Sequence, residues 1–214
     1  MTEHETAPQA PEGAHRLFGE RLSLAAAFAD ILADTGVSHG LIGPREVPRL
    51  WDRHILNCAV IADAFADGER VIDVGSGAGL PGLVLAIGRP DLELHLVEPM
   101  QRRTDWLSST VEDLGLDNVT VHRGRAEEMT GTLAAPAVTA RAVARLDKLA
   151  RWCLPLVEPG GRLVAMKGRS APEEIEQART VLRRLGGIDP RVVEHGEDVL
   201  REPTRTIQVT RSKR

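Results

Sequence analysis

A short apolar run that ends in a glycine-rich turn constrains this chain more than any other feature. Residues 71–74 read Val-Ile-Asp-Val, and residues 75–82 read Gly-Ser-Gly-Ala-Gly-Leu-Pro-Gly. The apolar run is typical of a buried strand, the glycines permit a tight loop, and Pro81 suits the first turn of a helix. Such a junction presents free backbone N–H groups and lets a ligand approach the main chain closely. The segment predicts a ligand-binding turn.

Beyond Gly68, short β-branched and aliphatic runs alternate with helical segments. The expected strands are residues 71–74, 94–97, 119–122, 137–140, 163–167, 189–194 and 205–210. The expected helices among them are residues 81–87, 101–114, 126–129, 145–154 and 172–185. This alternation predicts an α/β fold with a mostly parallel sheet and helices on both faces. We expect the last strand to pair antiparallel at or near an edge.

The first third of the chain has a different pattern. Apolar residues recur at helical spacing over residues 15–34 and 46–65, with a Gly- and Pro-containing loop between them. Residues 1–13 are polar, acidic and without an apolar core. We therefore expect a disordered tail over residues 1–13, a helical extension over residues 14–66 and a Rossmann-like core over residues 67–214.

Composition limits the partners of the protein. Residues 1–100 carry 15 acidic and 7 basic residues, a net charge of −8, whereas residues 101–214 carry 16 acidic and 20 basic residues, a net of +4. This asymmetry permits a basic face on a molecule whose net charge is −4. No apolar run is long enough to cross a membrane. Cys58 and Cys153 lie in apolar helical contexts without a metal-binding pattern, so we expect buried thiols, no metal site and a cytoplasmic protein.

The identity of the ligand follows from the frame of the loop. Asp73 to Gly79 reads D-x-G-x-G-x-G, with the acid just before the turn. A carboxylate there repels a diphosphate but suits a cationic ligand, which argues against a dinucleotide. Glu98 ends the next strand, 23 residues after Gly75, and is placed to accept hydrogen bonds from ribose hydroxyls. A glycine turn that only tightens a strand–helix connection is the remaining structural alternative.

The frame resembles motif I of class I S-adenosylmethionine-dependent methyltransferases. That resemblance implies that Gly75 and Gly77 admit the methionyl part of the cofactor and that Asp73 lies near its amine. After the third strand, Ala126 leaves room for an adenine ring, and Glu127 offers a backbone N–H or a carboxylate to the exocyclic amine. Alternatively, residues 126–129 form only a capped, solvated helical turn.

A closer resemblance extends along most of the chain. The sequences of residues 51–57 (WDRHILN), 73–82 (DVGSGAGLPG), 89–90 (RP), 139–142 (TARA) and 166–168 (MKG) resemble, in the same order, those of the RsmG (GidB) family. The chain departs from the family pattern in its acidic tail and at Asn57, where an acidic residue is common. The resemblance implies transfer of a methyl group from S-adenosylmethionine to N7 of one guanine in bacterial 16S ribosomal RNA.

The resemblance also assigns residues. Carried over by position, the cofactor residues are Gly75, Leu80, Ala126, Glu127 and Arg141, with Glu98 on the ribose. Arg141 follows the fourth strand and is expected to bridge cofactor and RNA, while Lys167 at the end of the fifth strand is expected to contact a phosphate. Other basic residues that could extend an RNA-binding face are Arg102, Arg103, Arg123, Arg125, Arg145, Lys148, Arg169 and Arg205.

The chemistry expected of such a site needs no general base, because guanine N7 has a free lone pair at neutral pH. Positioning and electrostatics are then the work of the enzyme. We expect a monomer that acts on 16S ribosomal RNA or a small ribosomal subunit, with no membrane or metal partner. Two alternatives are a methyltransferase for a small metabolite, which would have a closed apolar pocket, and a ribosome-associated protein that binds the cofactor without transferring a methyl group.

Overall fold

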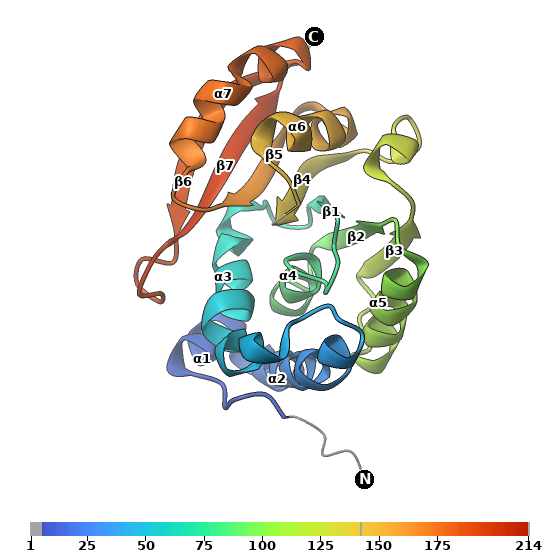
Figure 1. Cartoon of the computed structure of the whole chain (residues 1–214), viewed down its shortest axis with the longest axis vertical. Coiled ribbons are helices and arrows are strands. Elements are labelled where there is room, and N and C mark those ends of the chain that lie inside the picture. The colour runs from blue at the N-terminus through green and yellow to red at the C-terminus, as the bar shows by residue number, and fades with distance from the viewer. Residues whose placement is uncertain (1–5, 142, 214) are drawn as a thin grey trace.

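A seven-stranded sheet forms the centre of the computed structural model, which describes residues 6–141 and 143–213 (Figure 1). Within these residues the strand order is β3-β2-β1-β4-β5-β7-β6. The strands are β1 (Arg70–Val74), β2 (Glu93–Glu98), β3 (Val119–Arg123), β4 (Ala135–Arg141), β5 (Val157–Lys167), β6 (Gly187–His195) and β7 (Thr204–Arg211). The pairs among β1 to β5 are parallel, and β7 is antiparallel to both β5 and β6. The predicted mostly parallel sheet, with an antiparallel last strand beside the edge, is confirmed.

Helices cover both faces of this sheet, and each face has its own apolar core. The helices of regular α type are α1 (Glu12–Phe18), α2 (Leu22–Ile31), α3 (Leu56–Ala59), α4 (Gly82–Gly88), α5 (Gln101–Asp113), α6 (Leu146–Cys153) and α7 (Ala171–Arg184). One core contains Phe28, Ile55, Leu83 and Leu107, and so joins the N-terminal helices to α4 and α5. The other contains Leu149 and packs α6 and α7 on the opposite face (Figure 1). Because both faces are covered, four of the five residues of β1 are buried.

The two long N-terminal helices expected from the sequence are divided into short segments. The first includes the 3₁₀ turn η1 (Gly19–Arg21) and the π turn η2 (Leu32–Gly36), and Gly19 has a φ of +51°. The second consists of η3 (Pro44–Arg49), η4 (Leu50–Ile55), α3 and η5 (Val60–Ala64). Pro48 lies within η3 and has no N–H to donate, which prevents a regular α-helix there. Apolar periodicity found the buried face but not these changes of helical type.

The described part of the predicted tail is held against the N-terminal helices. Residues 1–5 lie outside the described residues. The Ala7 N–H donates to Asp30 Oδ1 at 3.0 Å, and Trp51 Nε1 donates to the Pro8 carbonyl at 2.8 Å. Helix α1 already begins at Glu12. An indole N–H and a carboxylate of the extension thus provide partners for the backbone of residues 7 and 8, within the segment for which we predict disorder.

The strand order determines where a ligand can bind. Strand β1 lies between β2 and β4, so the connections that leave it and β4 run to opposite sides of the sheet. In open α/β sheets, ligands bind beyond the carboxyl ends of the strands at such a reversal of order. Asp73 pairs in register with Leu96 on one side and Thr139 on the other. The glycine loop, Glu98 and Arg141 consequently meet at one edge of the sheet.

The close approach of β4 and β5 gives a test of the fold. A Cβ atom at Gly161 would lie 2.3 Å from the Pro136 carbonyl oxygen and 3.0 Å from that of Glu158, and backbone atoms cannot yield as a flexible side chain does. We expect Gly161→Ala to lower the free energy of unfolding by about 2 kcal/mol. Gly43→Ala is the matched control, because nothing lies within 4 Å of its Cβ position. Urea denaturation measures both, and equal stability of the two variants would contradict this packing.

Candidate active site

The loop after β1 has the backbone geometry that its glycines predict. Gly75, Gly77 and Gly79 have φ values of +73°, +54° and +74°, which residues other than glycine rarely adopt. The Gly75 N–H donates to the Val97 carbonyl at 2.8 Å, which fixes the loop to the end of β2. A Cβ atom at Gly75 would lie 2.9 Å from Val143 Cγ2. The loop therefore stays open to a ligand only while position 75 has no side chain.

Asp73 places a buried carboxylate beneath this loop. Its side chain is fully buried, and Oδ2 accepts a hydrogen bond from the Gly82 N–H at 3.0 Å. Oδ1 is also buried and has no partner. Burial raises the pKa of Asp73 to about 7, and the hydrogen bond from Gly82 opposes that rise only in part. An orphaned acceptor is costly in a protein interior, so a ligand that donates to Oδ1 would stabilise this site.

Glu98 lies beside the loop, but both of its oxygens are bonded to backbone. Oε2 accepts from the Gly77 N–H at 3.1 Å and Oε1 from the Met100 N–H at 3.0 Å. Arg103 Nη1 lies 3.7 Å from Oε2, and the Glu98 residue is 2% exposed. In this arrangement the carboxylate orients the glycine loop, and its predicted contact with a ribose stays a prediction.

A cavity of about 210 Å³ opens between the ends of β1, β2 and β3. The predicted Gly75, Ala126 and Glu127 line it. Its other lining residues are Val74, Val97, Pro99, Gly124, Arg125, Val143 and Trp152. Leu80 and Gly77 are not among them, and Leu80 is packed in the apolar core beside α4. Sequence analysis did not find Val143 and Trp152, because they come from the segment after β4 and from α6.

Arg141 points away from this cavity, into the N-terminal segment. Nη1 donates to the His54 carbonyl at 3.3 Å and to Cys58 Sγ at 3.0 Å. Nη2 donates to the Arg53 carbonyl at 3.2 Å and to His54 Nδ1 at 2.7 Å. The positive charge of Arg141 nevertheless favours the ionised form of Asp73. Arg141 therefore lies within electrostatic reach of the cofactor side while its hydrogen bonds hold η4. The motif residue Ala142, next to it, lies outside the described residues.

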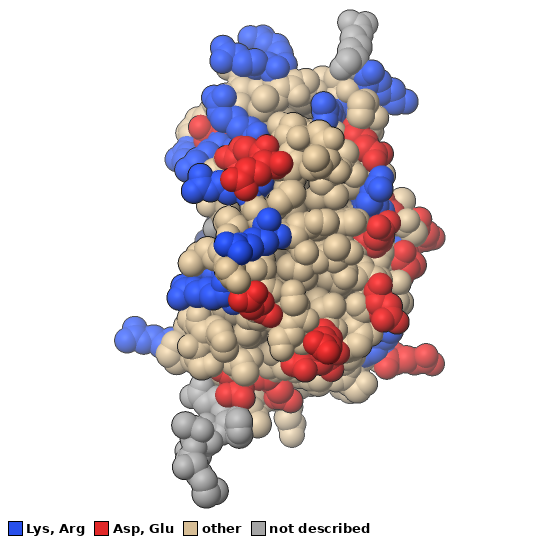
Figure 2. Space-filling model, turned by 90° about the vertical axis from the view of Figure 1, so that its right-hand side faces the viewer, with Lys and Arg blue, Asp and Glu red and all other residues tan. Residues whose placement is uncertain are grey.

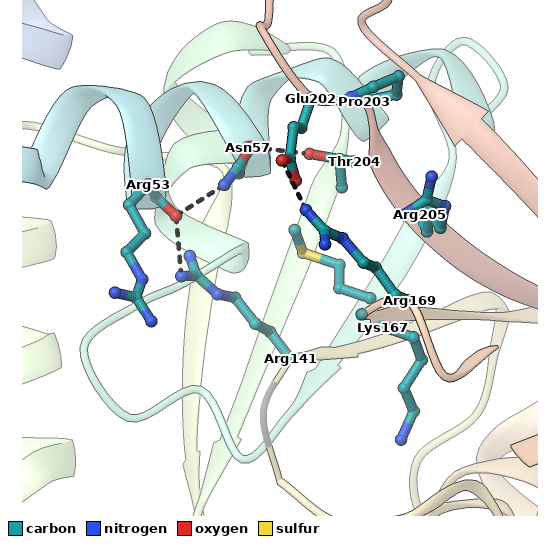
Figure 3. A pocket seen from close by; sticks show the side chains of 11 residues that line it. Arg53, Asn57, Arg141, Lys167, Arg169, Glu202, Pro203, Thr204 and Arg205 are labelled. Atoms are coloured by element: carbon teal, nitrogen blue, oxygen red, sulfur yellow. Dashed lines mark hydrogen bonds and ion pairs between the residues drawn. The ribbon is translucent and has the colours of Figure 1, made fainter.

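Lys167 is less accessible than its predicted phosphate contact requires. Its Nζ donates to the Ala144 carbonyl at 2.6 Å and forms an ion pair of 2.8 Å with Glu174 Oε2. The Lys167 side chain is 9% exposed. Figure 3 shows this side chain directed away from Arg169 and Glu202. Lys167 thus joins β5 to α7 here, and a contact with RNA would require the ion pair to open.

A second, larger depression has Arg141 in its lining, and we call it the arginine groove. It has a volume of about 470 Å³ (Figure 3). Its lining residues are Arg53, Asn57, Arg141, Met166, Lys167, Gly168, Arg169, Glu202, Pro203, Thr204 and Arg205. Thr204 Oγ1 donates to Asn57 Oδ1 at 2.9 Å, which joins the two walls of the groove. A neighbouring cavity of about 720 Å³ shares Arg53, Asn57 and Glu202 and adds Arg49 and Arg201.

The basic residues singled out from the sequence are distributed over several places. Arg169 and Arg205 line the arginine groove, while Arg125 lines the smaller cavity. Lys148 lies over the Trp152 ring, with Nζ 5.0 Å from its centroid. Sequence analysis missed Arg53, whose place in the groove depends on the turn of η4. On the face shown in Figure 2, Lys and Arg gather along one edge and the top, while Asp and Glu dominate the opposite edge and the base.

Two other classes of site find no support in the described residues. No described group of three or more His, Cys, Asp and Glu side chains is arranged to hold a metal ion. Across residues 6–141 and 143–213, no helix combines the length and apolar character that a membrane crossing needs.

Comparison with known proteins identifies the relatives of this chain. A family model described as rRNA small subunit methyltransferase G matches residues 21–202. The "Ribosomal RNA small subunit methyltransferase G" of Paenarthrobacter aurescens is 56% identical over 202 residues, which cover 94% of each chain. The protein of the same description from Streptomyces avermitilis is 52% identical over 208 residues, covering 97% of this chain and 87% of the relative.

Solved structures with much lower identity share the fold. The apo form of the S-adenosylmethionine-dependent methyltransferase SibL superposes with a TM-score of 0.63 at 16% identity, covering 86% of this chain and 62% of that one. An S-adenosylmethionine-dependent O-methyltransferase from Thermotoga maritima gives a TM-score of 0.59 at 18% identity, covering 87% and 72%. The predicted class I S-adenosylmethionine-dependent methyltransferase fold, with an N-terminal helical extension, is confirmed.

The geometry at Gly75 predicts how ligand binding in the smaller cavity changes when this residue gains a side chain. We expect Gly75→Ala to weaken binding of S-adenosylhomocysteine at least about tenfold, because the added Cβ strains the loop and crowds Val143. Gly40→Ala is the control: Gly40 has a similar φ of +67°, but nothing lies within 4 Å of its Cβ position. Calorimetry measures both affinities, and full affinity of Gly75→Ala would show that the ligand binds elsewhere.

The raised pKa of Asp73 predicts a pH dependence of binding. Above about pH 7 the carboxylate is ionised and attracts an ammonium group, whereas below pH 7 it is protonated and loses that attraction. The affinity for S-adenosylhomocysteine should therefore fall as pH decreases from 8 to 6, by up to about tenfold per pH unit. Asp73→Asn should bind weakly and with a flatter profile. An unchanged profile in Asp73→Asn would assign the titration to another group.

Proposed function

This chain belongs to the rRNA small subunit methyltransferase G family, and we propose that it transfers a methyl group from S-adenosylmethionine to N7 of one guanine in 16S ribosomal RNA. The observation that carries the proposal is the pairing of two unlike cavities. One, beside the glycine loop and Asp73, suits a nucleoside with a cationic amino-acid part. The other, lined by arginines that include Arg141, suits the phosphates of RNA.

The smaller cavity fits S-adenosylmethionine on three counts. Gly75 in its lining has no side chain to exclude a ligand, Ala126 leaves space for a flat ring, and Asp73, whose Oδ1 lacks a partner, adjoins the lining residue Val74. The cofactor amine would supply a donor to that oxygen. When bound, the cofactor supplies a methyl group from its sulfonium sulfur, and the sulfur keeps the electron pair of the carbon–sulfur bond. The residues of this chain hold the ends of the cofactor, and Glu98 keeps the loop in place through the Gly77 N–H.

The reaction would need no general base from this chain. Guanine N7 would contribute its own lone pair to the methyl group that the cofactor supplies, and the sulfur would keep the electron pair of the bond that breaks, so no residue has to remove a proton. Cys58 and Cys153 are buried, and burial raises the pKa of both thiols, so neither serves as a nucleophile. Catalysis then depends on the distance and alignment between guanine and cofactor, which the protein controls by binding both.

The arginine groove supports an RNA substrate over a small metabolite. A methyltransferase for a metabolite was expected to enclose its substrate in an apolar pocket, but this groove presents Arg53, Arg169 and Arg205. Arg169 is paired with Glu202 at 2.6 Å, and both side chains are more than two-thirds exposed. A phosphate can therefore replace Glu202 as the partner of Arg169 at little cost. We further propose that the protein acts in the cytoplasm as a monomer.

The decisive experiment uses labelled S-adenosylmethionine with small ribosomal subunits, or stripped 16S RNA, from a strain that lacks the gene. We expect label in a single 7-methylguanosine, located by nuclease mapping. Asp73→Asn should reduce transfer at limiting cofactor, because its binding site loses a negative charge. Label that enters only small molecules would refute RNA as the substrate. Cofactor binding without any methyl transfer would favour a cofactor-binding assembly protein.

A further inference from the structure

The smaller cavity beside the glycine loop has a mostly apolar lining. Of the ten described residues that line it, six have apolar side chains, two are glycines and two are charged. Asp73 and Glu98, whose carboxylates suit the polar parts of a nucleoside cofactor, adjoin this cavity without lining it. An apolar lining favours an uncharged, flat ring over an amino-acid group, whose charges need polar partners. The cavity therefore suits the adenine part of S-adenosylmethionine.

Trp152, from α6, is the one aromatic residue among the described residues of this lining. It is half-buried, whereas Trp51 and Trp106 are only 4% and 5% exposed. The indole N–H of Trp51 donates to the Pro8 carbonyl at 2.8 Å, and that of Trp106 donates to Thr35 Oγ1 at 3.0 Å. Those two indoles pack the N-terminal helices in the opposite core. Trp152 is therefore the indole that a ligand in the cavity can reach.

A lysine of the same helix occupies one face of the Trp152 ring. Lys148 precedes Trp152 by four residues on α6, so the two side chains lie on the same side of that helix. The Lys148 Nζ atom lies over the ring, 5.0 Å from its centroid, which is a cation–π contact. Because the ammonium group covers one face of the indole, the opposite face is the one that remains for a ligand.

A small side chain and a large flat one line the same cavity. Ala126 begins the 3₁₀ turn η6 (Ala126–Met129) and is 6% exposed. It belongs to the apolar core of α6 and α7, and Trp152 packs against that core. The Ala126 methyl group leaves depth for a ring, and the indole offers that ring a broad aromatic surface. Purine bases stack well on such surfaces, whatever their hydrogen-bonding pattern.

We propose that Trp152 stacks on the adenine ring of S-adenosylmethionine, with Ala126 lining the same subsite, and that α6 is thereby part of the cofactor site. Trp152 lies outside the sequence segments that carry the family resemblance. The inference rests on the proposed function for the identity of the cofactor. The site then binds the two ends of its ligand by different chemistry, with charge at Asp73 and stacking at Trp152.

Indole fluorescence tests the contact without any methyl transfer. Titration of the wild-type protein with S-adenosylhomocysteine should quench its tryptophan emission over the same concentrations at which calorimetry detects binding. Trp152→Phe keeps an aromatic ring, so its affinity should stay within about threefold of the wild type while most of the quench disappears. Trp106→Phe is the matched control and should keep both the affinity and the quench. A full quench in Trp152→Phe would overturn the proposal.

A second variant separates stacking from simple packing. Trp152→Leu keeps an apolar side chain but removes the flat ring, so we expect its affinity for S-adenosylhomocysteine to fall about tenfold. The affinity for 5′-methylthioadenosine, which has the base but no amino-acid part, should fall by a similar factor. S-ribosylhomocysteine, which lacks the base, should bind wild type and variant equally, as measured by competition. An equal loss for this ligand would refute stacking on adenine. If Trp152→Leu does not fold in a thermal unfolding assay, the fluorescence of Trp152→Phe decides.

Failure of this inference and failure of the proposed function give different results. A wild-type protein whose emission is quenched by S-adenosylhomocysteine, but which methylates neither RNA nor a small molecule, would refute the proposed function and support stacking on Trp152. Methyl transfer to 16S RNA by a Trp152→Leu protein with full affinity for S-adenosylhomocysteine would overturn the stacking and leave the proposed function intact.

Discussion

The hydrogen bond from the Gly82 N–H to the buried Asp73 carboxylate is the contact on which the cofactor side of this molecule depends. A Cβ atom at position 82 would lie 2.7 Å from that carboxylate oxygen and 2.3 Å from Leu96, so β1 and α4 approach this closely only because residue 82 is glycine. The pKa of Asp73 is higher in the fold than the ordinary 3.8, so the ligand-free fold loses stability as pH rises from about 4 to about 7. A cationic ligand offsets this loss. Asp73, which shapes the loop through its bond to the Gly82 N–H, is thus also the residue that most needs a ligand.

The carboxyl ends of the strands carry two different environments. Gly75, Ala126 and Glu127 line a small cavity, whereas Arg53, Arg141, Arg169 and Arg205 line a wide groove. All four hydrogen bonds of Arg141 go to the N-terminal segment, and that extension shares one apolar core with α4 and α5. The extension is therefore part of the site and more than a cover for the sheet.

The sequence was sufficient for the fold because its signals are local. Apolar runs and glycines located all seven strands and the loop at Gly75, and the acid at position 73 distinguished a cationic nucleoside from a diphosphate. Side-chain partners were beyond its reach, because they join distant segments. Lys167 is paired with Glu174, and the motif residue Arg89 binds Asp67 and Asp91 and so stabilises a turn. A family motif records that a residue matters, but only the packing shows whether it touches a ligand or another part of the chain.

The walls of the arginine groove come from opposite ends of the polypeptide. Arg53 and Asn57 belong to the N-terminal segment, whereas Glu202, Thr204 and Arg205 belong to the last fifteen residues, and the bond from Thr204 to Asn57 joins them. All the residues that line the smaller cavity have been synthesised once translation has passed Trp152. During translation, the residues of the cofactor cavity therefore leave the exit tunnel before those of the groove. A nascent chain gains its complete basic surface only when β7 has left the exit tunnel, so it cannot engage ribosomal RNA through this groove before then.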